Sequence, residues 1–182
     1  LQYAEREPRF YASVAYNGSV WEMSTSYDDY NRFYRAWYYH DSNDGKVAQT
    51  GDLYLRTGIG IKKFYNPQDS YMNGGRITPK LDTAIRYAEV LLIYAEALNE
   101  LNGTYEIASW DNSKTYSIKR DKEEMAKSIK PIRIRAGLPN YSDDVYSSKD
   151  EFRKKLKRER QIELFAEGHR YYDLRRWKDA PE

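Results

Sequence analysis

This sequence of 182 residues lacks several features that would point to a function directly. It has no cysteine, which excludes disulfides, thiolate metal sites and cysteine nucleophiles. It has no run of about 18 apolar residues, so no membrane-spanning helix is expected. Lysine and arginine number 30 against 28 aspartate and glutamate, and a net charge of +2 gives no strong field to attract nucleic acid. We therefore expect no nucleic-acid partner.

Aliphatic residues are also scarce, and aromatic residues take part of their place. The sequence contains 19 tyrosines, 4 tryptophans and 5 phenylalanines. A tyrosine buries its ring but keeps a hydroxyl for water or a ligand. This composition favours a surface-rich or incomplete domain over a compact enzyme. The chain begins with Leu1-Gln2-Tyr3, without methionine or a targeting leader, and we expect it to start within a longer protein.

The sequence divides near residue 80 into a loop-rich aromatic segment (1–80) and a helical segment (81–182), which together are expected to form one domain. In the first segment, residues 10–16 alternate between apolar and more polar side chains, and Asn17-Gly18 follows. Alternation broken by Asn-Gly predicts a β-hairpin. Residues 53–61 predict one more short strand.

Three helices are predicted in the second segment, at about 82–101, 121–136 and 147–167. The first helix carries two apolar stripes, which predicts that it is covered on both sides. The stretch between the first two helices is polar and is predicted to be a loop that holds Trp110.

Three glutamates, Glu159, Glu163 and Glu167, follow each other at helical spacing in the third predicted helix. Paired carboxylates can hydrolyse glycosidic bonds, but they must then flank the bond in a cleft. Here Arg158 and Arg160 lie among them, so the pattern favours a salt-bridged helix face.

Metal binding has little support in the sequence. The only two histidines, His40 and His169, are far apart and lack ligand spacing. The segment Asp41–Gly45 resembles the start of a calcium loop, but its glycine comes one residue early and no glutamate occupies the twelfth position. The segment favours a polar turn. We predict no catalytic residue, no metal site and no cofactor.

An aromatic cluster is the sharpest functional signal that the residues give by themselves. Its members are Tyr27, Tyr30, Phe33, Tyr34, Trp37, Tyr38 and Tyr39. At helical spacing Tyr27, Tyr30, Tyr34 and Trp37 could form a core stripe, whereas on a loop the same residues could form a platform on which ligands stack. Flat rings suit sugar faces, nucleobases and peptides alike. Both interpretations remain open at this point.

Several stretches, in the same order along the chain, resemble the SusD/RagB family of outer-membrane nutrient-binding lipoproteins. Three lie in the second half: Arg86–Asn99 resembles the long helix of the family, Ile132–Pro139 a second signature, and Arg158–Trp177 the most diagnostic one. Upstream, Glu7–Tyr11 and Thr57-Gly58 are similar to the Asp-Pro-Arg and Thr-Gly segments of the family. Glu7 stands where aspartate is usual.

The resemblance implies a mainly α fold, with helices packed as in a tetratricopeptide-like superhelix, long loops and a small β-hairpin. Family members are much longer, so this chain would be their C-terminal part. We also predict that Gly168–Trp177 turns back and holds the helices together, with Arg170, Arg175 and Arg176 facing Glu163, Glu167 and Asp173.

The resemblance implies binding without catalysis. Such proteins lie on the extracellular face of the outer membrane, held by a lipid anchor that would lie outside this chain. They capture a glycan, or in some members a peptide, and deliver it to a SusC-like TonB-dependent transporter.

Five aromatic residues are the candidates for ligand contact, chosen because they cluster in polar loops: Trp37, Tyr38, Tyr39 and Trp21, with Trp110 as the outlier. Two other functions compete with glycan capture. One is a glycoside hydrolase fragment, and the other is a helical-repeat module that binds a partner protein.

Overall fold

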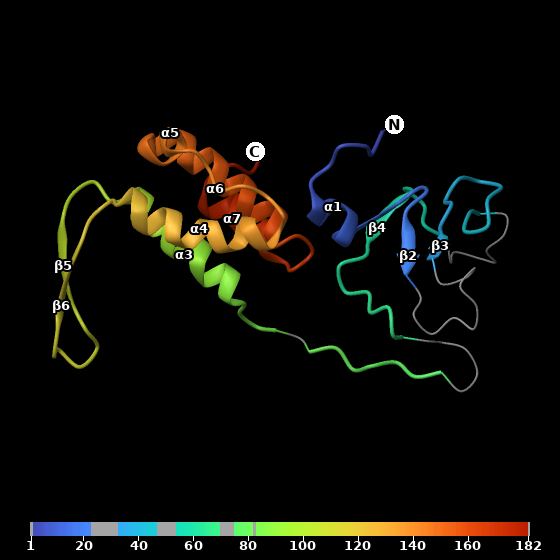
Figure 1. Ribbon diagram of the computed structural model, residues 1–182, viewed down its shortest axis with the longest axis horizontal. Coiled ribbons are helices and arrows are strands. Elements are labelled where there is room, and N and C mark those ends of the chain that lie inside the picture. The colour runs from blue at the N-terminus through green and yellow to red at the C-terminus, as the bar shows by residue number, and fades with distance from the viewer. Residues whose placement is uncertain (1, 23–32, 47–53, 70–74, 82, 182) are drawn as a thin grey trace. The chain divides into compact units, whose positions relative to one another are not determined.

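The computed structural model describes residues 2–22, 33–46, 54–69, 75–81 and 83–181 (Figure 1). The chain forms two compact units, Leu1–Asp82 and Thr83–Glu182, which are described separately below.

The described residues of the first unit form one short helix and four short strands. They are α1 (Pro8–Ser13), β1 (Val14–Tyr16), β2 (Val20–Glu22), β3 (Phe33–Arg35) and β4 (Ile59–Ile61). All pairing is antiparallel, β1 with β4 and β2 with β3, in two separate two-stranded sheets.

The strand predicted over 10–16 is therefore wrong in its first half. Proline at the first position of α1 fixes a helical φ, and residues 10–13 continue the helix. The predicted hairpin through Asn17-Gly18 is wrong as well. A tight turn does form, with the Ser19 amide donating to the Tyr16 carbonyl at 2.8 Å. The Gly18 amide, however, donates to the Ala36 carbonyl, so β2 turns toward β3 instead of pairing with β1.

The second unit is helical, with a β-hairpin between its first two helices (Figure 1). Its helices are α3 (Tyr87–Glu100), α4 (Lys122–Arg135), α5 (Asp143–Ser147), α6 (Lys149–Glu163) and α7 (His169–Arg176). The hairpin consists of β5 (Tyr105–Ala108) and β6 (Thr115–Ile118). The three predicted helices correspond to α3, α4 and α6, whereas α5, α7 and the hairpin were not predicted.

Capping residues account for two of the helix starts. The Asp121 side chain accepts hydrogen bonds from the amides of Glu123 and Glu124 at the start of α4. The Ser148 hydroxyl accepts one from the Glu151 amide at the start of α6. Both satisfy amides that the first turn of a helix leaves without a partner.

The core of the second unit lies where α3, α4 and α6 pack together. Its members are Leu92, Ala95, Leu98, Met125, Ile129, Ile132, Tyr146, Phe152, Leu156 and Leu164. Only one side of α3 is buried in this core, because Tyr87, Val90 and Tyr94 remain exposed. The prediction that this helix is covered on both sides does not hold within this unit.

Arginine–carboxylate pairs connect the helices around this core. Glu163, only 4% exposed, accepts from Arg86 at 3.1 Å and from Arg135 at 2.5 Å. Arg86 also pairs with Glu167 at 2.7 Å. The backbone of Arg86 is extended, so α3 begins one residue later and the guanidinium reaches α6. The prediction that the three glutamates form salt bridges is thus confirmed for Glu163 and Glu167.

The last helix closes the unit as the sequence predicted, though with different partners. Asp173 on α7 accepts from Arg160 on α6 at 2.7 Å and from Arg176 at 2.8 Å. Arg176 also pairs with Glu96 on α3, and the Trp177 indole donates to Glu96 at 2.7 Å. Charged hydrogen bonds of this kind are stronger than neutral ones, so α7 fixes α3 to α6.

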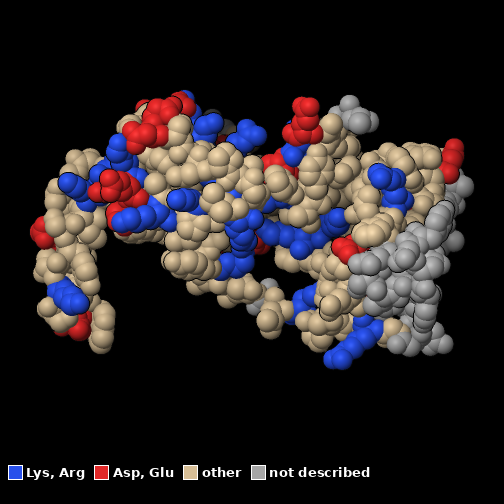
Figure 2. Space-filling model, viewed as in Figure 1, with Lys and Arg blue, Asp and Glu red and all other residues tan. Residues whose placement is uncertain are grey.

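The mainly α fold is confirmed, and its small hairpin is formed by β5 and β6 instead of the strands around Asn17-Gly18. Figure 2 shows lysine and arginine side chains lying among aspartate and glutamate side chains over the helical unit. Within the described part of the chain, no helix has both the length and the apolar character needed to cross a membrane.

Candidate functional site

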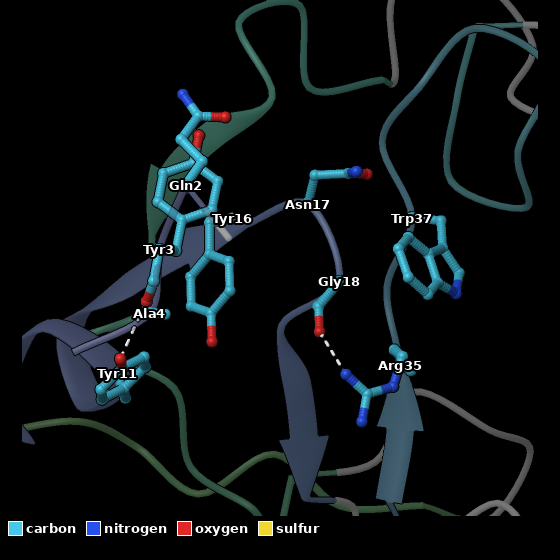
Figure 3. A pocket seen from close by; sticks show the side chains of 9 residues that line it. All are labelled: Gln2, Tyr3, Ala4, Tyr11, Tyr16, Asn17, Gly18, Arg35 and Trp37. Carbon is cyan, nitrogen blue, oxygen red and sulfur yellow. Dashed lines mark hydrogen bonds between the residues drawn. The ribbon is translucent and has the colours of Figure 1, made fainter. Parts of the chain in front are cut away.

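The first unit contains a pocket of about 490 Å³ with an aromatic lining (Figure 3). The described residues that line it are Gln2, Tyr3, Ala4, Tyr11, Tyr16, Asn17, Gly18, Arg35 and Trp37. A concave surface that combines rings with a few polar groups is the usual form of a small-molecule site. This pocket is therefore the candidate functional site.

One wall of the pocket is a cluster of tyrosine rings. The Tyr3 and Tyr16 ring centroids lie 4.9 Å apart, and the Tyr11 ring meets that of Tyr16 edge to face at 6.1 Å. Phe10 packs against all three of these tyrosines. The Tyr11 hydroxyl donates to the Tyr3 carbonyl at 2.8 Å, which joins the N-terminal segment to α1. Such ring pairs stabilise one another beyond simple burial, so this wall is pre-formed.

The opposite wall is Trp37, which follows the end of β3. Its amide donates to the Asp44 carboxylate at 3.1 Å, and its carbonyl accepts from the Asp44 amide at 3.1 Å. The Ser42 hydroxyl also donates to that carbonyl. The backbone of Trp37 is thus fixed from several directions, while its side chain remains 39% exposed. A ring held in this way can receive a ligand without first losing conformational freedom.

The turn that holds Trp37 is the segment Asp41–Gly45. Asp44 accepts from the Tyr34 hydroxyl at 2.8 Å as well as from the Trp37 amide. The Asp44 carboxylate therefore serves protein donors, which agrees with the polar-turn interpretation of this segment.

Glycine at position 18 allows Trp37 to come close to the β1–β2 turn. Its φ of +85° lies in the left-handed region, which favours glycine. A Cβ atom at this position would lie 3.1 Å from a ring carbon of Trp37. The backbone conformation therefore favours glycine here, and an added methyl group would have to shift the indole.

Two polar side chains of the pocket, Asn17 and Arg35, are oriented by hydrogen bonds within the protein. The Asn17 side-chain oxygen accepts from the Tyr38 amide at 2.7 Å, which fixes the orientation of the side chain. Arg35 Nη1 donates to the Gly18 carbonyl at 2.8 Å. Among the described lining residues, none is acidic and Arg35 carries the formal charge.

The hydroxyls of Tyr16, which lines the pocket, and of Tyr34, which supports it through Asp44, stay protonated at neutral pH. Burial raises the pKa of Tyr16, with a further increase from Tyr11 and an opposing effect from Arg35. Burial and the hydrogen bond to Asp44 raise the pKa of Tyr34 to about 12. Tyr16 therefore presents a neutral hydroxyl to the pocket and does not act as a base, whereas the hydroxyl of Tyr34 is engaged by Asp44.

The structure places the predicted site residues in different surroundings. Trp37 lines the pocket, and the Tyr39 ring lies beside it with a centroid separation of 6.3 Å and an exposure of 58%. Trp21 and Tyr38 contact each other, since the indole donates to the Tyr38 hydroxyl at 3.2 Å. Neither is among the pocket-lining residues.

Trp21 has further contacts that explain its position. Its ring meets that of Tyr65 edge to face at 4.9 Å. The Lys62 ammonium lies 5.5 Å from the Trp21 ring centroid and donates to the Val20 carbonyl at 2.7 Å. Burial lowers the pKa of Lys62. These contacts give Trp21 a structural role in the first unit.

Trp110 belongs to the second unit, where it lies in the turn between β5 and β6 and is 96% exposed. It is not part of the pocket lining. Tyr27 and Tyr30 of the aromatic cluster lie outside the described residues.

Sequence analysis missed most of the residues that surround Trp37. Tyr3, Tyr11, Tyr16 and Arg35 come from four places in the chain, and no spacing rule connects them. Only Tyr11 and Tyr16 gave a usable signal, because they precede the Asn17-Gly18 turn that the sequence marks.

Comparison with known proteins places the whole chain in one family. The model of the SusD family matches residues 1–182. SusD-like protein P2 from Formosa agariphila is 37% identical over 120 residues, which is 65% of this chain and 21% of that protein. SusD-like protein P38 from the same organism is 28% identical over 170 residues, which is 91% of this chain and 27% of that protein.

A solved structure shows the same fold. The structure of selenomethionine BT4246 superimposes with a TM-score of 0.64 at 24% sequence identity, covering 96% of this chain and 27% of that one. This chain thus spans between a fifth and about a quarter of the length of the proteins it matches.

Proposed function

This chain belongs to the SusD family, and from that premise we propose that it captures a glycan at the cell surface for import. The observation that carries the proposal is the pocket in which Trp37 faces a wall of tyrosine rings. Pyranose rings present flat C–H faces that pack well on aromatic rings. The function is binding, with no bond made or broken.

In the proposed mechanism, Trp37 and the tyrosine wall take the apolar faces of one or two sugar units. Asn17, Arg35 and the tyrosine hydroxyls then select among sugars through their hydroxyl groups. The wall and the tryptophan are both held by contacts within the protein, so little conformational entropy is lost on binding. Tyr39 extends the ring surface beyond the pocket.

The proposal also includes a location and a partner, which are those expected for the family. The protein would lie on the extracellular face of the outer membrane, anchored by a lipid outside this chain, and would pass its glycan to a SusC-like TonB-dependent transporter. Some members of the family capture a peptide, so a peptide is the alternative ligand within the same proposal.

The two competing functions are less well supported. A glycoside hydrolase would need two free cleft carboxylates, whereas Glu163 and Glu167 bind Arg86. A helical-repeat module would use the exposed side of α3, where Tyr87 is 75% exposed. A pocket of about 460 Å³ adjoins that side, but Tyr87 is the one aromatic residue among the described residues that line it, whereas the pocket of the first unit is lined by several rings.

Affinity electrophoresis of the full-length protein in gels that contain different polysaccharides tests the proposal. We expect at least one glycan to slow the wild-type protein, and Trp37→Ala to weaken that binding about tenfold, because losing one ring contact costs on the order of 1.4 kcal/mol. Phe64→Ala is the matched control, since Phe64 is an exposed ring of the same unit outside the pocket. Equal migration of the Trp37→Ala and wild-type proteins in every binding gel would contradict the proposal.

A further inference from the structure

We propose that the pocket of the first unit selects glycans that carry an anionic group, either a uronate carboxylate or a sulfate ester, and that Arg35 recognises this group. The inference rests on the proposed function and specifies its ligand class. It is carried by the charge of the pocket, the free donors of Arg35 and the position of its guanidinium between the two aromatic walls.

The formal charge of the described pocket lining is positive. Arg35 is the charged residue among the described residues that line it, and the other polar lining groups are amides, hydroxyls and an indole. Within the described part of the chain, no carboxylate forms an ion pair with Arg35. Its charge is therefore not cancelled by the protein where a ligand would bind, unlike the charges of Arg86 and Arg160 in the second unit.

The guanidinium keeps most of its donors for a ligand. A guanidinium has five N–H groups in a planar fork. Nη1 of Arg35 donates to the Gly18 carbonyl at 2.8 Å, which fixes the orientation of the fork. The remaining donors match the spacing of two oxygens of a carboxylate or sulfate, which arginine binds in a bidentate manner.

The position of Arg35 places these donors beside the sugar-stacking surfaces. Arg35 ends β3 and lies two residues before Trp37, opposite Val20 in the register of β2 and β3. Figure 3 shows its guanidinium at the Gly18 carbonyl, between the Tyr16 ring and the Trp37 side chain. A sugar stacked on either ring would carry its anionic substituent toward the guanidinium.

Matched pairs of glycans separate charge from sugar identity. Isothermal titration calorimetry on the full-length protein would compare polygalacturonate with its methyl ester, which keeps the backbone and removes the charge. Dextran sulfate and dextran would form the sulfate pair, and neutral xylan, mannan and starch would complete the panel.

The expected result is at least tenfold tighter binding of one anionic member than of its neutral partner, as a charge-assisted hydrogen bond added to the same ring contacts would give. Arg35→Gln should abolish that difference while leaving the weaker neutral binding in place. Arg35→Lys should keep part of the preference, because it keeps the charge but not the fork. Arg56→Gln removes the same charge from an exposed position outside the pocket and should change nothing.

The outcomes distinguish the inference from the proposed function. If neutral glycans bind and Trp37→Ala weakens them, but no anionic partner binds more tightly, the anion selectivity is wrong and glycan capture stands. A preference for anionic polymers that survives Arg35→Gln would show general attraction to charge and would equally overturn the role of Arg35. If no glycan in the panel binds to the wild-type protein, both the proposed function and this inference fail.

Discussion

At the scale of single residues, the pocket depends on the contact between Gly18 and Trp37. The turn that Gly18 completes needs a positive φ, and the indole of Trp37 lies where a Cβ atom would point. Trp37 is itself held through its backbone by Asp44. Small changes at position 18 should therefore move a ring that we assign to ligand binding.

Gly18→Ala tests this dependence. We expect a loss of stability of about 1 kcal/mol from the left-handed backbone and, in addition, weaker glycan binding, because the new methyl group displaces the indole. Thermal unfolding and affinity electrophoresis of the same preparations would measure the two effects.

Gly58→Ala is the matched control for this substitution. Gly58 also has a positive φ, of +67°, but a Cβ atom there would meet nothing within 4 Å. It should lose similar stability and keep full binding. Equal binding by the two variants would show that the contact between Gly18 and Trp37 does not position the ring.

At the scale of elements, charged side chains rather than apolar ones decide how the ends of the helices meet. Glu163 on α6 joins Arg86, just before α3, to Arg135 at the end of α4. Glu163 is buried, and its pairs with the two arginines offset the cost of removing its charge from water. One carboxylate thus fixes the relative positions of three helices.

Glu163→Gln is expected to destabilise the second unit by about 3 kcal/mol, because it leaves the partly buried Arg86 with a weaker set of acceptors. Urea unfolding followed by far-UV circular dichroism would measure the change. Glu151→Gln on the same helix should cost much less stability, because Glu151 is exposed and its pair with Lys154 is a surface pair. Similar losses in the two variants would refute the bridging role of Glu163.

The β5–β6 hairpin is held by hydrogen bonds within its turn. Asp111 accepts from the Ser109 and Ser113 hydroxyls at 2.6 and 2.8 Å and from the Ser113 amide at 3.1 Å. These bonds, led by that of Ser109, lower the pKa of Asp111 from 3.8 to about 2. Because the folded pKa is depressed, the stabilisation is fully present above about pH 4 and is lost as the pH falls through about 2.

A carboxyl titration by NMR checks this turn. Asp111 should titrate near pH 2, and Ser109→Ala should raise its pKa toward the ordinary value, since the hydroxyl donor is removed. A pKa close to 3.8 in the wild-type protein would mean that the turn does not form as described.

The elements show where sequence patterns are informative and where they fail. The helices α3, α4 and α6 could be predicted, because apolar periodicity and caps such as Ser148 are local signals. The pairing of β1 with β4 could not, since it depends on residues more than 40 positions apart. Of the pocket lining, only Trp37 was predicted as a site residue. Arg35 reaches the pocket through the pairing of β3 with β2, and Tyr3 through ring contacts with Phe10 and Tyr16, and neither arrangement has a local sequence signal.

At the scale of the whole molecule, the two units have different roles in the proposed function: the helical unit is a scaffold, and the first unit binds the ligand. The helical unit contains segments that resemble the SusD family, such as Arg158–Trp177. Residues of this segment form arginine–carboxylate pairs that hold its helices. The first unit carries the aromatic pocket. Scaffold and candidate binding surface are thus encoded in different halves of the sequence.

The exposed apolar side of α3 is a second feature of the whole molecule. The relatives of this chain are several times longer. Helical repeats bury their apolar faces by stacking on neighbours. The exposed Tyr87, Val90 and Tyr94 are consistent with a helix that packs against further helices in a longer protein.

The central claim is that Trp37 and the tyrosine wall form the glycan site. A crystal structure of the full-length protein with its tightest-binding oligosaccharide tests it most directly. The account predicts a sugar ring stacked on Trp37 at a contact distance of about 4 Å, facing Tyr16 and within hydrogen-bonding reach of Arg35. An oligosaccharide bound elsewhere, for example on Trp110, with the pocket left empty would contradict it.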